Sequence, residues 1–156
     1  MLRKNKGSSL IEVMVALFIL AIGLLGTLKM QIYSMQLHRV AYYNTQTSFL
    51  ISQITDSIRS NKQVSAGYAI DLDDPSPVAT KDCNIDTCNR FEMRDFDLQQ
   101  WRQSVESTLP SGKSQIIAVD GGYAVTVQYD DGIHNSDLDK SHIVENTMVT
   151  QFSKDM

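Results

Sequence analysis

Residues 10–28 read LIEVMVALFILAIGLLGTL, nineteen positions that carry a single charge, Glu12. As a helix this stretch is about 28 Å long at about 1.5 Å per residue, close to the roughly 30 Å hydrocarbon core of a bilayer. Three bases lie among the first seven residues and only Lys29 follows closely, so the N-terminus is expected in the cytoplasm and the rest beyond the inner membrane. We therefore predict a single membrane-spanning helix, with the membrane itself as one partner.

A cleaved secretory signal peptide is the alternative interpretation of a basic tip followed by an apolar run. The run is longer than the usual apolar region of about 7–15 residues, and no clear A-x-A cleavage site follows it. Glu12 lies three residues into the run, where a lone carboxylate costs about 2.5–3.5 kcal/mol on insertion scales. Such a carboxylate normally marks a function, and the simpler interpretation is an interfacial Glu that only reaches the lipid headgroups.

The stretch KNKGSSLIEVMVALFILAIGLLG, residues 4–26, resembles the class III signal of type IV prepilins and type II secretion pseudopilins. In that family a dedicated prepilin peptidase cuts a short basic leader after its terminal Gly and then N-methylates the new N-terminus. The resemblance implies that residues 1–7 are the leader, that Gly7 is its last residue, and that Ser8 becomes methylated. Glu12 matches the characteristic Glu of the fifth mature position. Mature members usually begin with Phe, and Ser8 departs from that pattern.

Cleavage after Gly7 gives Glu12 a partner of opposite charge. An α-amino group has an ordinary pKa of about 7.7–8.0, so the new amine on Ser8 is largely cationic at neutral pH, and N-methylation keeps the charge. Both charges are tolerated in a low-dielectric helix bundle when they pair along one helix or between neighbouring helices. The resemblance implies such a role for Glu12 in the register between subunits. The implied partners are other minor and major pilins, bound through this helix, and an inner-membrane assembly platform.

Charge is unevenly distributed along the 156 residues. The whole chain has fourteen Lys and Arg against eighteen Asp and Glu, a net charge of −4, but from Gln63 onward seven bases face sixteen acids, hence −9. Phosphate contacts need clusters of Lys and Arg, so no nucleic-acid partner is expected for this acidic part. Charged residues make up 21% and hydrophobic ones 42%, which excludes bulk disorder and a polytopic membrane protein.

The helical pattern continues beyond the apolar run, and no Pro or turn cluster appears before about residue 61. Apolar residues recur at intervals of three and four, which is typical of one helix face; they are Tyr33, Leu37, Val40, Ile51, Ile54 and Ile58. We therefore predict a long helix over residues 8–62, with a membrane-spanning half at about 10–28. Its second half is expected to pack against a globular head formed by residues 63–156.

Cys83 and Cys88, in DCNIDTC, are the chain's two cysteines. Beyond the inner membrane such a pair is expected to oxidise to a structural disulfide. The loop that it closes has six residues, for which the chain-entropy estimate is about 2 kcal/mol. A catalytic thiol or half of a metal site are the alternatives, but C-x4-C lacks C-x-x-C spacing and no nearby His completes a ligand set.

The remaining sequence predicts a helix followed by an antiparallel sheet. Asp97-Leu-Gln-Gln, a D-x-x-Q variant of the capping box, predicts the start of a short helix that Pro110 and Gly112 end, with Trp101 as a core anchor. QIIAV and YAVTVQY flank a DGG turn and alternate as strands do, and residues 142–152 supply a weaker third strand. With the long helix these elements predict an α+β fold, pilin-like in the order of its parts.

The head also resembles a narrower group, the minor pilins of type IV pili, in the order C-x4-C, DFDLQQWRQSVESTLPSG and an alternating strand. Major pilins usually clasp a C-terminal loop with their cysteines, whereas the pair here is internal and close. The resemblance implies a structural subunit needed for pilus assembly, first held in the inner membrane with its head in the periplasm and then incorporated in the pilus. The alternatives are a minor pseudopilin of a type II secretion system and a membrane-anchored periplasmic binding domain, which has no need of Glu12.

The sequence contains no recognisable catalytic constellation. His38, His134 and His142 are scattered, and G-x-S-x-G, H-E-x-x-H, P-loop and G-x-G-x-x-G motifs are absent. Acidic residues within 71–74 and 130–139 offer oxygen ligands for Ca²⁺, but they lack EF-hand spacing, which favours solvated loops. We therefore expect no enzyme, no metal site and no cofactor.

Overall fold

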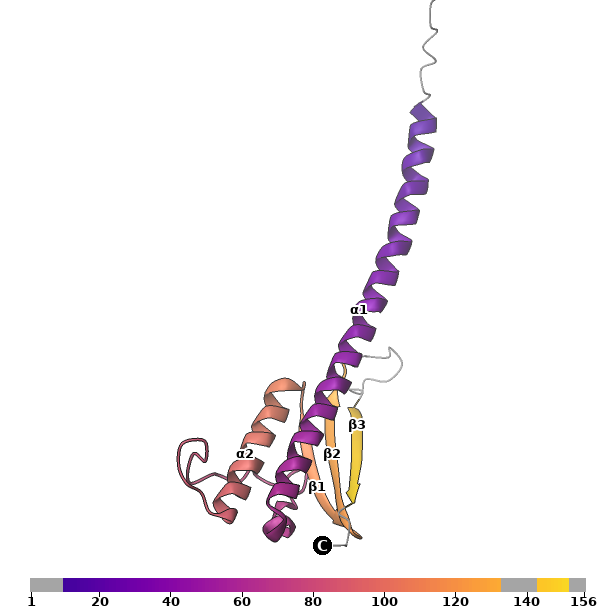
Figure 1. Cartoon of the computed structure of the whole chain (residues 1–156). Helices are drawn as coiled ribbons and strands as arrows, with labels where there is room; N and C mark the ends of the chain where they lie inside the picture. The colour runs from indigo at the N-terminus through magenta and orange to yellow at the C-terminus, as the bar shows by residue number, and fades with distance from the viewer. Residues whose placement is uncertain (1–9, 133–142, 152–156) are drawn as a thin grey trace, which may run out of the picture. The chain divides into compact units, whose positions relative to one another are not determined.

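The computed structural model describes residues 10–132 and 143–151 (Figure 1). The elements follow in the order α1 (Leu10–Ser60), the 3-10 helix η1 (Lys62–Tyr68), α2 (Arg90–Thr108), β1 (Lys113–Val119), β2 (Gly122–Asp130) and β3 (Ile143–Gln151). Contacts divide the chain into two compact units, Met1–Arg39 and Val40–Met156, with the boundary inside α1. A long N-terminal apolar helix followed by a small head with an antiparallel sheet confirms the predicted α+β, type IV pilin-like fold.

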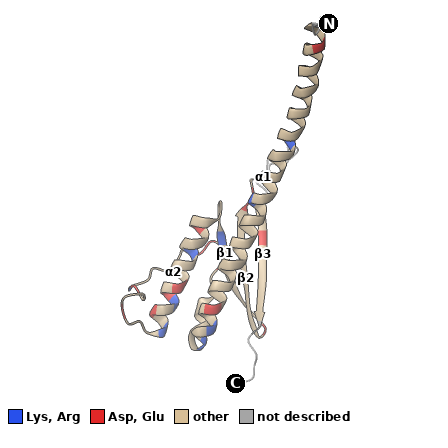
Figure 2. Ribbon diagram, turned by 45° about the horizontal axis from the view of Figure 1, so that its top comes forward, with Lys and Arg blue, Asp and Glu red and all other residues tan. Residues whose placement is uncertain are grey.

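The first part of α1, from Leu10 to Arg39, is exposed at every position. Figure 2 shows one acidic band near its start and then a long stretch without charge. Leu, Ala and Met are good helix formers, and no Pro removes a backbone donor along this stretch. The backbone is therefore satisfied within the helix, while its apolar side chains have nothing in the same unit to cover them.

The second part of α1, from Val40 to Ser60, buries one face. The buried positions recur at intervals of three and four, as an amphipathic helix requires; they are Thr47, Leu50, Ile51, Ile54, Thr55 and Ile58. The apolar positions predicted at 51, 54 and 58 are thus confirmed as a core face. Tyr33 and Leu37, predicted on the same face, are exposed because they precede the part of the helix that contacts the head.

The start predicted for the second helix is wrong. Helix α2 begins at Arg90, seven residues before Asp97, and Asn89 is its N-cap. The Asn89 side chain accepts hydrogen bonds from the backbone N–H groups of Phe91 and Glu92, at 2.9 and 3.0 Å, and the Glu92 carboxylate accepts one from the Asn89 N–H at 2.8 Å. This reciprocal pair is a capping box in the form N-x-x-E, and it leaves Asp97 in the middle of the helix.

The sheet has the order β1-β2-β3, with both pairs antiparallel. Strands β1 and β2 are joined by a two-residue turn in which Gly121 has φ +78°, a left-handed conformation that glycine adopts at no steric cost. Strand β3 pairs with β2 in an unbroken register from Gly122↔Gln151 to Asp130↔Ile143. All three strands predicted from the alternating sequence are confirmed.

The core lies between one face of the sheet and the two helices of the head, the second part of α1 and α2 (Figure 1). Strand β2 contributes every second residue to it, namely Tyr123, Val125, Val127 and Tyr129, all of them buried. Trp101 is 1% exposed, which confirms it as the predicted core anchor. The hydroxyl of Tyr129 donates a hydrogen bond of 2.9 Å to Asn44 Oδ1 on α1.

Candidate processing and assembly site

The apolar surface of α1 needs surroundings other than water. An 18-residue window of this helix has a mean hydropathy of 2.5, and none of that window is buried. By length and composition the helix can cross a membrane. A core helix of a soluble protein meets the same length and hydropathy criteria, but such a helix is mostly buried, and this one is not. The exposed leucines, isoleucines and phenylalanine of the window therefore fit lipid or other helices as neighbours.

Glu12 lies in the first turn of α1. Its side chain is exposed in this first described turn. Within residues 10–132 and 143–151, no cation forms an ion pair with it. Gly7, Ser8 and the rest of the predicted leader 1–7 lie outside the described residues, so cleavage, methylation and pairing with the Ser8 amine stay predictions.

A comparison with protein-family models finds a match for residues 2–28 to the prokaryotic N-terminal methylation motif. The matched residues contain Gly7, Ser8, Glu12 and the whole apolar run. The searches of curated proteins and of solved structures found no match. The match lies within the first 28 residues, and the head is characterised by its own structure.

The motif and the fold together support a type IV pilin-like protein, a pilin or pseudopilin subunit. The motif implies processing by a prepilin peptidase and assembly with other pilins. With the apolar helix it also indicates anchoring in a membrane and then incorporation in a filament. Proteins of this type are structural, and the expectation that this chain has no enzymatic activity stays a prediction.

A disulfide joins Cys83 and Cys88, as the sequence predicts. Two backbone N–H groups of the loop that it closes bond to Asp82, the residue before Cys83: Asp82 Oδ1 accepts a hydrogen bond from Asn84 N at 3.0 Å, and the Asp82 carbonyl accepts one from Ile85 N at 3.1 Å. Ile85 is 84% exposed inside this closed loop. The bridge thus holds a short surface loop, and its sulfur atoms are not available as a thiol nucleophile or as metal ligands.

The acidic residues at 71–74 interact with neighbouring polar groups. Asp73 forms a 2.8 Å ion pair with Lys113, which lowers the pKa of Asp73 first through the hydrogen bond and then through the charge. Asp71 Oδ1 accepts a 3.0 Å hydrogen bond from Gln115. Across the described ranges, His, Cys, Asp and Glu form no group of three or more that is placed to hold a metal ion. His134, His142 and the acids at 137 and 139 lie outside those ranges.

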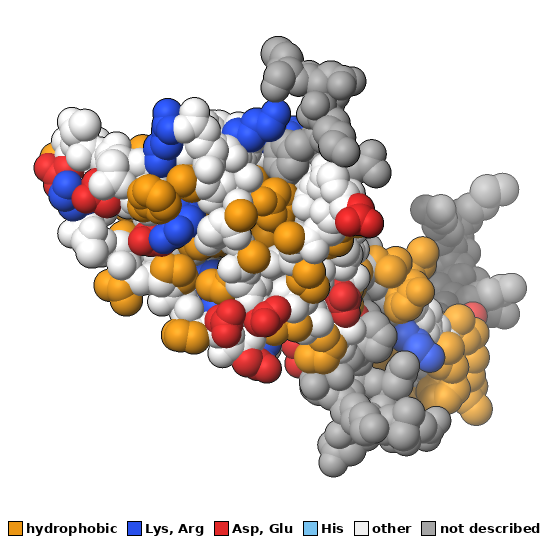
Figure 3. Space-filling view, turned by 90° about the horizontal axis from the view of Figure 1, so that it is seen from below, with side chains coloured by type: hydrophobic (Ala, Val, Ile, Leu, Met, Phe, Trp, Pro, Cys, Tyr) orange, Lys and Arg blue, Asp and Glu red, His pale blue; other side chains and the backbone are white. Residues whose placement is uncertain are grey.

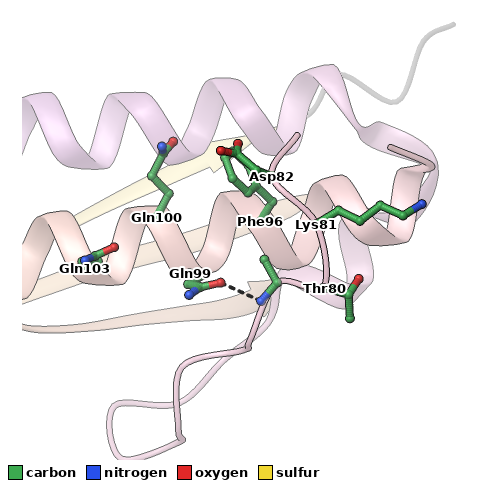
Figure 4. A pocket seen from close by; sticks show the side chains of 8 residues that line it. Thr80, Lys81, Asp82, Phe96, Gln99, Gln100 and Gln103 are labelled. Carbon is green, nitrogen blue, oxygen red and sulfur yellow. Dashed lines mark hydrogen bonds between the residues drawn. The ribbon is translucent and has the colours of Figure 1, made fainter. Parts of the chain in front are cut away.

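One cavity of about 360 Å³ lies between the loop before the disulfide and the outer face of α2 (Figure 4). Its lining is mostly polar and comprises Ala79, Thr80, Lys81, Asp82, Phe96, Gln99, Gln100 and Gln103. Gln99 Oε1 accepts a 2.6 Å hydrogen bond from Ala79 N, and Lys81 pairs with Glu92 at 2.9 Å. These contacts fix the loop on the helix. No histidine, cysteine or serine lines the cavity.

A partly buried hydrogen-bond network joins the end of α1 to α2. The Tyr68 hydroxyl donates to Asp97 Oδ2 at 2.7 Å, and Asn61 Nδ2 donates to the Tyr68 hydroxyl at 3.2 Å and to the Arg90 carbonyl at 2.8 Å. Burial raises the pKa of Asp97 more than the hydrogen bond from Tyr68 lowers it. Burial and the same carboxylate also raise the pKa of Tyr68. This network fixes η1 between the two helices.

Arg102 was not identified from the sequence, although it is 5% exposed and holds the head together. Its guanidinium donates to the carbonyls of Asp71 and Asp74, and to that of Ser114 at 3.1 Å. Burial lowers its pKa, and the charges of Asp74 and Glu106 partly oppose that effect. Its spacing in the sequence was the one sign that Arg102 is buried, because position 102 falls on the same helical face as positions 98, 101 and 105.

Proposed function

We propose that the chain is a minor pilin, a structural subunit of the type IV pilus that is needed to begin or support pilus assembly. The single observation that supports this most strongly is the methylation motif on residues 2–28, joined to an apolar helix that is exposed at every described position of the match. A plain membrane anchor requires the apolar residues but not Glu12. The carboxylate therefore favours a helix that leaves lipid to pack beside others.

The minor rather than major class is supported by the head. Its disulfide closes a loop between residues 83 and 88, whereas major pilins usually use their cysteines to clasp a C-terminal loop. The spacing of Asp97-Leu98, Trp101 and Leu109-Pro110 resembles that of the minor pilin PilV. In the structure, Leu98, Trp101 and Leu109 are core residues, so the spacing reflects a packing pattern as well as a sequence pattern.

In this proposal the prepilin peptidase removes residues 1–7 by cutting between Gly7 and Ser8, and methylates Ser8. The mature chain has a helix up to about residue 62, with its membrane-spanning half at 10–28, and a periplasmic head from residue 63. The Ser8 amine, or that of a neighbouring subunit, pairs with Glu12 when the helices pack. Its partners are other minor and major pilins and the inner-membrane assembly platform.

The test is a deletion strain assayed for twitching and pilus yield beside an assay of type II secretion. Loss of pili with normal secretion is the expected result. Loss of secretion with normal pili would assign the chain instead to the minor pseudopilins, whose N-termini carry the same motif. Retention of both activities would contradict any assembly role and leave a membrane-anchored binding domain.

A further inference from the structure

The two edges of the sheet differ in the backbone contacts that they make with the rest of the head. The segment that begins at Ile70 runs along the outer edge of β1, where Ile70 N donates to the Ile116 carbonyl at 3.0 Å and Ile116 N donates to the Ile70 carbonyl at 2.9 Å. Arg102 fastens this segment, because it donates both to the Asp71 carbonyl and to the Ser114 carbonyl of β1. The N–H and carbonyl of Ile116 and the carbonyl of Ser114 on this edge are thus paired within the head.

The other edge is strand β3, which lies on the outside of the sheet (Figure 1). In the described part of the chain, β3 forms its backbone ladder with β2 alone, and no other backbone hydrogen bond reaches it. Every second residue of a strand directs its N–H and C=O away from its one partner, so the outer edge presents a row of such groups.

The sequence of β3 has few of the features that usually protect an edge strand. Edge strands are typically short, or are interrupted by a bulge, a Pro or several charges, because an unpaired edge is a template for another strand. Strand β3 has nine residues in unbroken register, without Pro, Gly, Lys or Arg, and with Glu145 as its one charge. Ile143 and Val149 are 54% and 58% exposed on it.

Glu145 determines which charge is favoured on a strand that pairs with this edge. It lies in a cross-strand row with Gln128 and Lys113, and Gln128 Nε2 donates to its carboxylate at 3.2 Å. The outer side of the carboxylate has no cation within the described residues. Opposite charges on adjacent strands stabilise a pair and like charges oppose it. A strand with Lys or Arg at this position is therefore the favoured neighbour.

A second copy of this chain is disfavoured by the same reasoning. Its own β3 contains no Lys or Arg, and its head, from residue 63 onward, carries seven bases against sixteen acids. Figure 3 shows acidic side chains on the surface of the head beside hydrophobic ones. Two such heads edge to edge would bring together net negative charges with no cation to pair with Glu145.

We propose that β3 is an assembly edge, on which an extended segment of a different pilin-type subunit pairs as a fourth strand and places a Lys or Arg beside Glu145. The main-chain hydrogen bonds of such β-augmentation supply affinity, and the alternating side chains supply selectivity. The proposal rests on the proposed function, because it takes the partner to be another subunit of the filament.

The test uses the full-length chain, expressed in its own cells with a photo-reactive benzoylphenylalanine at Val149 on β3 or, as the matched control, at Ile117 on β1. Both residues are exposed apolar positions in one cross-strand row through Ala124, at opposite edges of the sheet. After irradiation the cross-linked peptides are mapped by mass spectrometry. We expect an adduct from position 149, and not from 117, with a strand-like segment of another protein that carries its own N-terminal methylation motif.

A charge-reversed pair sharpens this test. Glu145→Lys should lower the yield of the adduct from position 149 about fivefold, since an attraction becomes a repulsion across the strands. Asp120→Lys makes the same change in net charge at an exposed position in the β1–β2 turn, and it should leave the yield unchanged. Circular dichroism spectra of both variants that match the wild type show that the head has folded.

Three outcomes overturn the inference. They are adducts with β3 of a second copy, equal adducts from positions 117 and 149, and no adduct from 149 in cells where the chain is processed and co-purifies with filaments. The proposed function is judged separately, by that processing and co-purification. The chain could form the adduct from position 149 with a subunit that carries the motif and yet never reach filaments. That result would support β3 as a pairing edge and would contradict a function in the pilus.

Discussion

The indole Nε1 of Trp101 donates a hydrogen bond of 3.0 Å to the backbone oxygen of Leu50, which lies 51 residues earlier in the chain. Both residues are buried, and the bond joins α2 to the second part of α1. A single side chain thus provides both a large apolar surface and a directional contact between the two helices of the head.

Replacing Trp101 with Phe tests that contact. Trp101→Phe removes the donor and part of the buried ring, and it should lower the free energy of unfolding by about 1–3 kcal/mol. Phe91→Ala is the control, because Phe91 is on the same helix but 60% exposed, and its effect should stay within about 0.5 kcal/mol. Urea unfolding of the full chain in detergent, followed by circular dichroism, measures both. Equal effects of the two substitutions would contradict the role of Trp101.

Cleavage at the proposed leader boundary is tested by Gly7→Val. A branched side chain beside the scissile bond should leave an unprocessed precursor in the inner membrane, about 0.8 kDa heavier than the mature chain. That figure applies the mean residue mass of the chain, from 17.5 kDa over 156 residues, to the seven residues of the proposed leader. Gly23→Val is the matched control, because a side chain at that position meets no other atom within 4 Å. Intact-mass analysis of the assembled wild-type protein should show the loss of Met1–Gly7, and retention of Met1 there would exclude prepilin processing.

Glu12 separates assembly from anchoring. Glu12→Gln removes the charge that is costly in lipid, so membrane insertion and cleavage at Gly7 should be unchanged. Packing beside other helices should fail, since an amine left buried without its partner costs about 3–5 kcal/mol. Glu12→Asp keeps the charge and should retain part of the assembly. Piliation and twitching are the readouts, and a Glu12→Gln strain with wild-type pili would remove the assembly role from this residue.

The disulfide should stabilise the head modestly. Replacing Cys83 and Cys88 together by Ser should lower the free energy of unfolding by about 2 kcal/mol, because the unfolded chain gains the freedom of a short loop. Ile85→Ala, an exposed change inside the same loop, should have an effect within about 0.5 kcal/mol. Nonreducing peptide mapping of exported protein should find the two cysteines joined. Free thiols at both positions would contradict the assignment.

The stability of the head should depend on pH through Asp97. Burial raises the pKa of this carboxyl in the folded state, so the folded protein binds the proton more tightly than the unfolded chain. The contribution of this group to stability is therefore present below its unfolded pKa and is lost as the pH rises through the higher folded pKa. Asp97→Asn keeps an acceptor for the Tyr68 hydroxyl but does not ionise.

The measurement is urea unfolding of the full chain in detergent between about pH 3 and about pH 7, a range that spans the ordinary and raised pKa of a carboxyl. The stability of the Asp97→Asn variant should rise relative to the wild type as the pH increases. Asp86→Asn, an exposed change in the disulfide loop, should not alter the slope. Parallel curves for wild type and Asp97→Asn would show that burial does not control this carboxyl.

Local patterns predicted most of this fold because periodicity and turn chemistry belong to neighbouring residues. The uninterrupted apolar run predicted α1, and the alternation from Tyr123 to Tyr129 predicted both strand β2 and the face that it turns to the core. The start of α2 was misplaced because Asp97-Leu-Gln-Gln satisfies the side-chain pattern of a cap, yet Asn89 and Glu92 form one earlier. Both patterns were in the sequence, and packing along the whole helix decided between them.

Contacts between distant segments could not be predicted in the same way. The β-bridge between Ile70 and Ile116 and the hydrogen bonds from Arg102 to backbone carbonyls join segments that are 12 to 46 residues apart. No local sequence pattern encodes these contacts. In the candidate site, Gly7, Ser8 and Glu12 were singled out by the resemblance of residues 4–26 to the prepilin signal. The partners proposed for this site include the peptidase and other subunits, and a single sequence contains no signal that identifies them.

The uninterrupted backbone of α1 has a consequence for how the chain changes surroundings. Within residues 10–39 each interior N–H is bonded to a carbonyl four residues earlier, so the peptide groups require nothing from lipid, water or neighbouring protein. Transfer of this segment from a bilayer to a filament alters only what touches its side chains. Extraction and return therefore need no unfolding step, and the same helix can make the passage in either direction with its internal bonding unchanged.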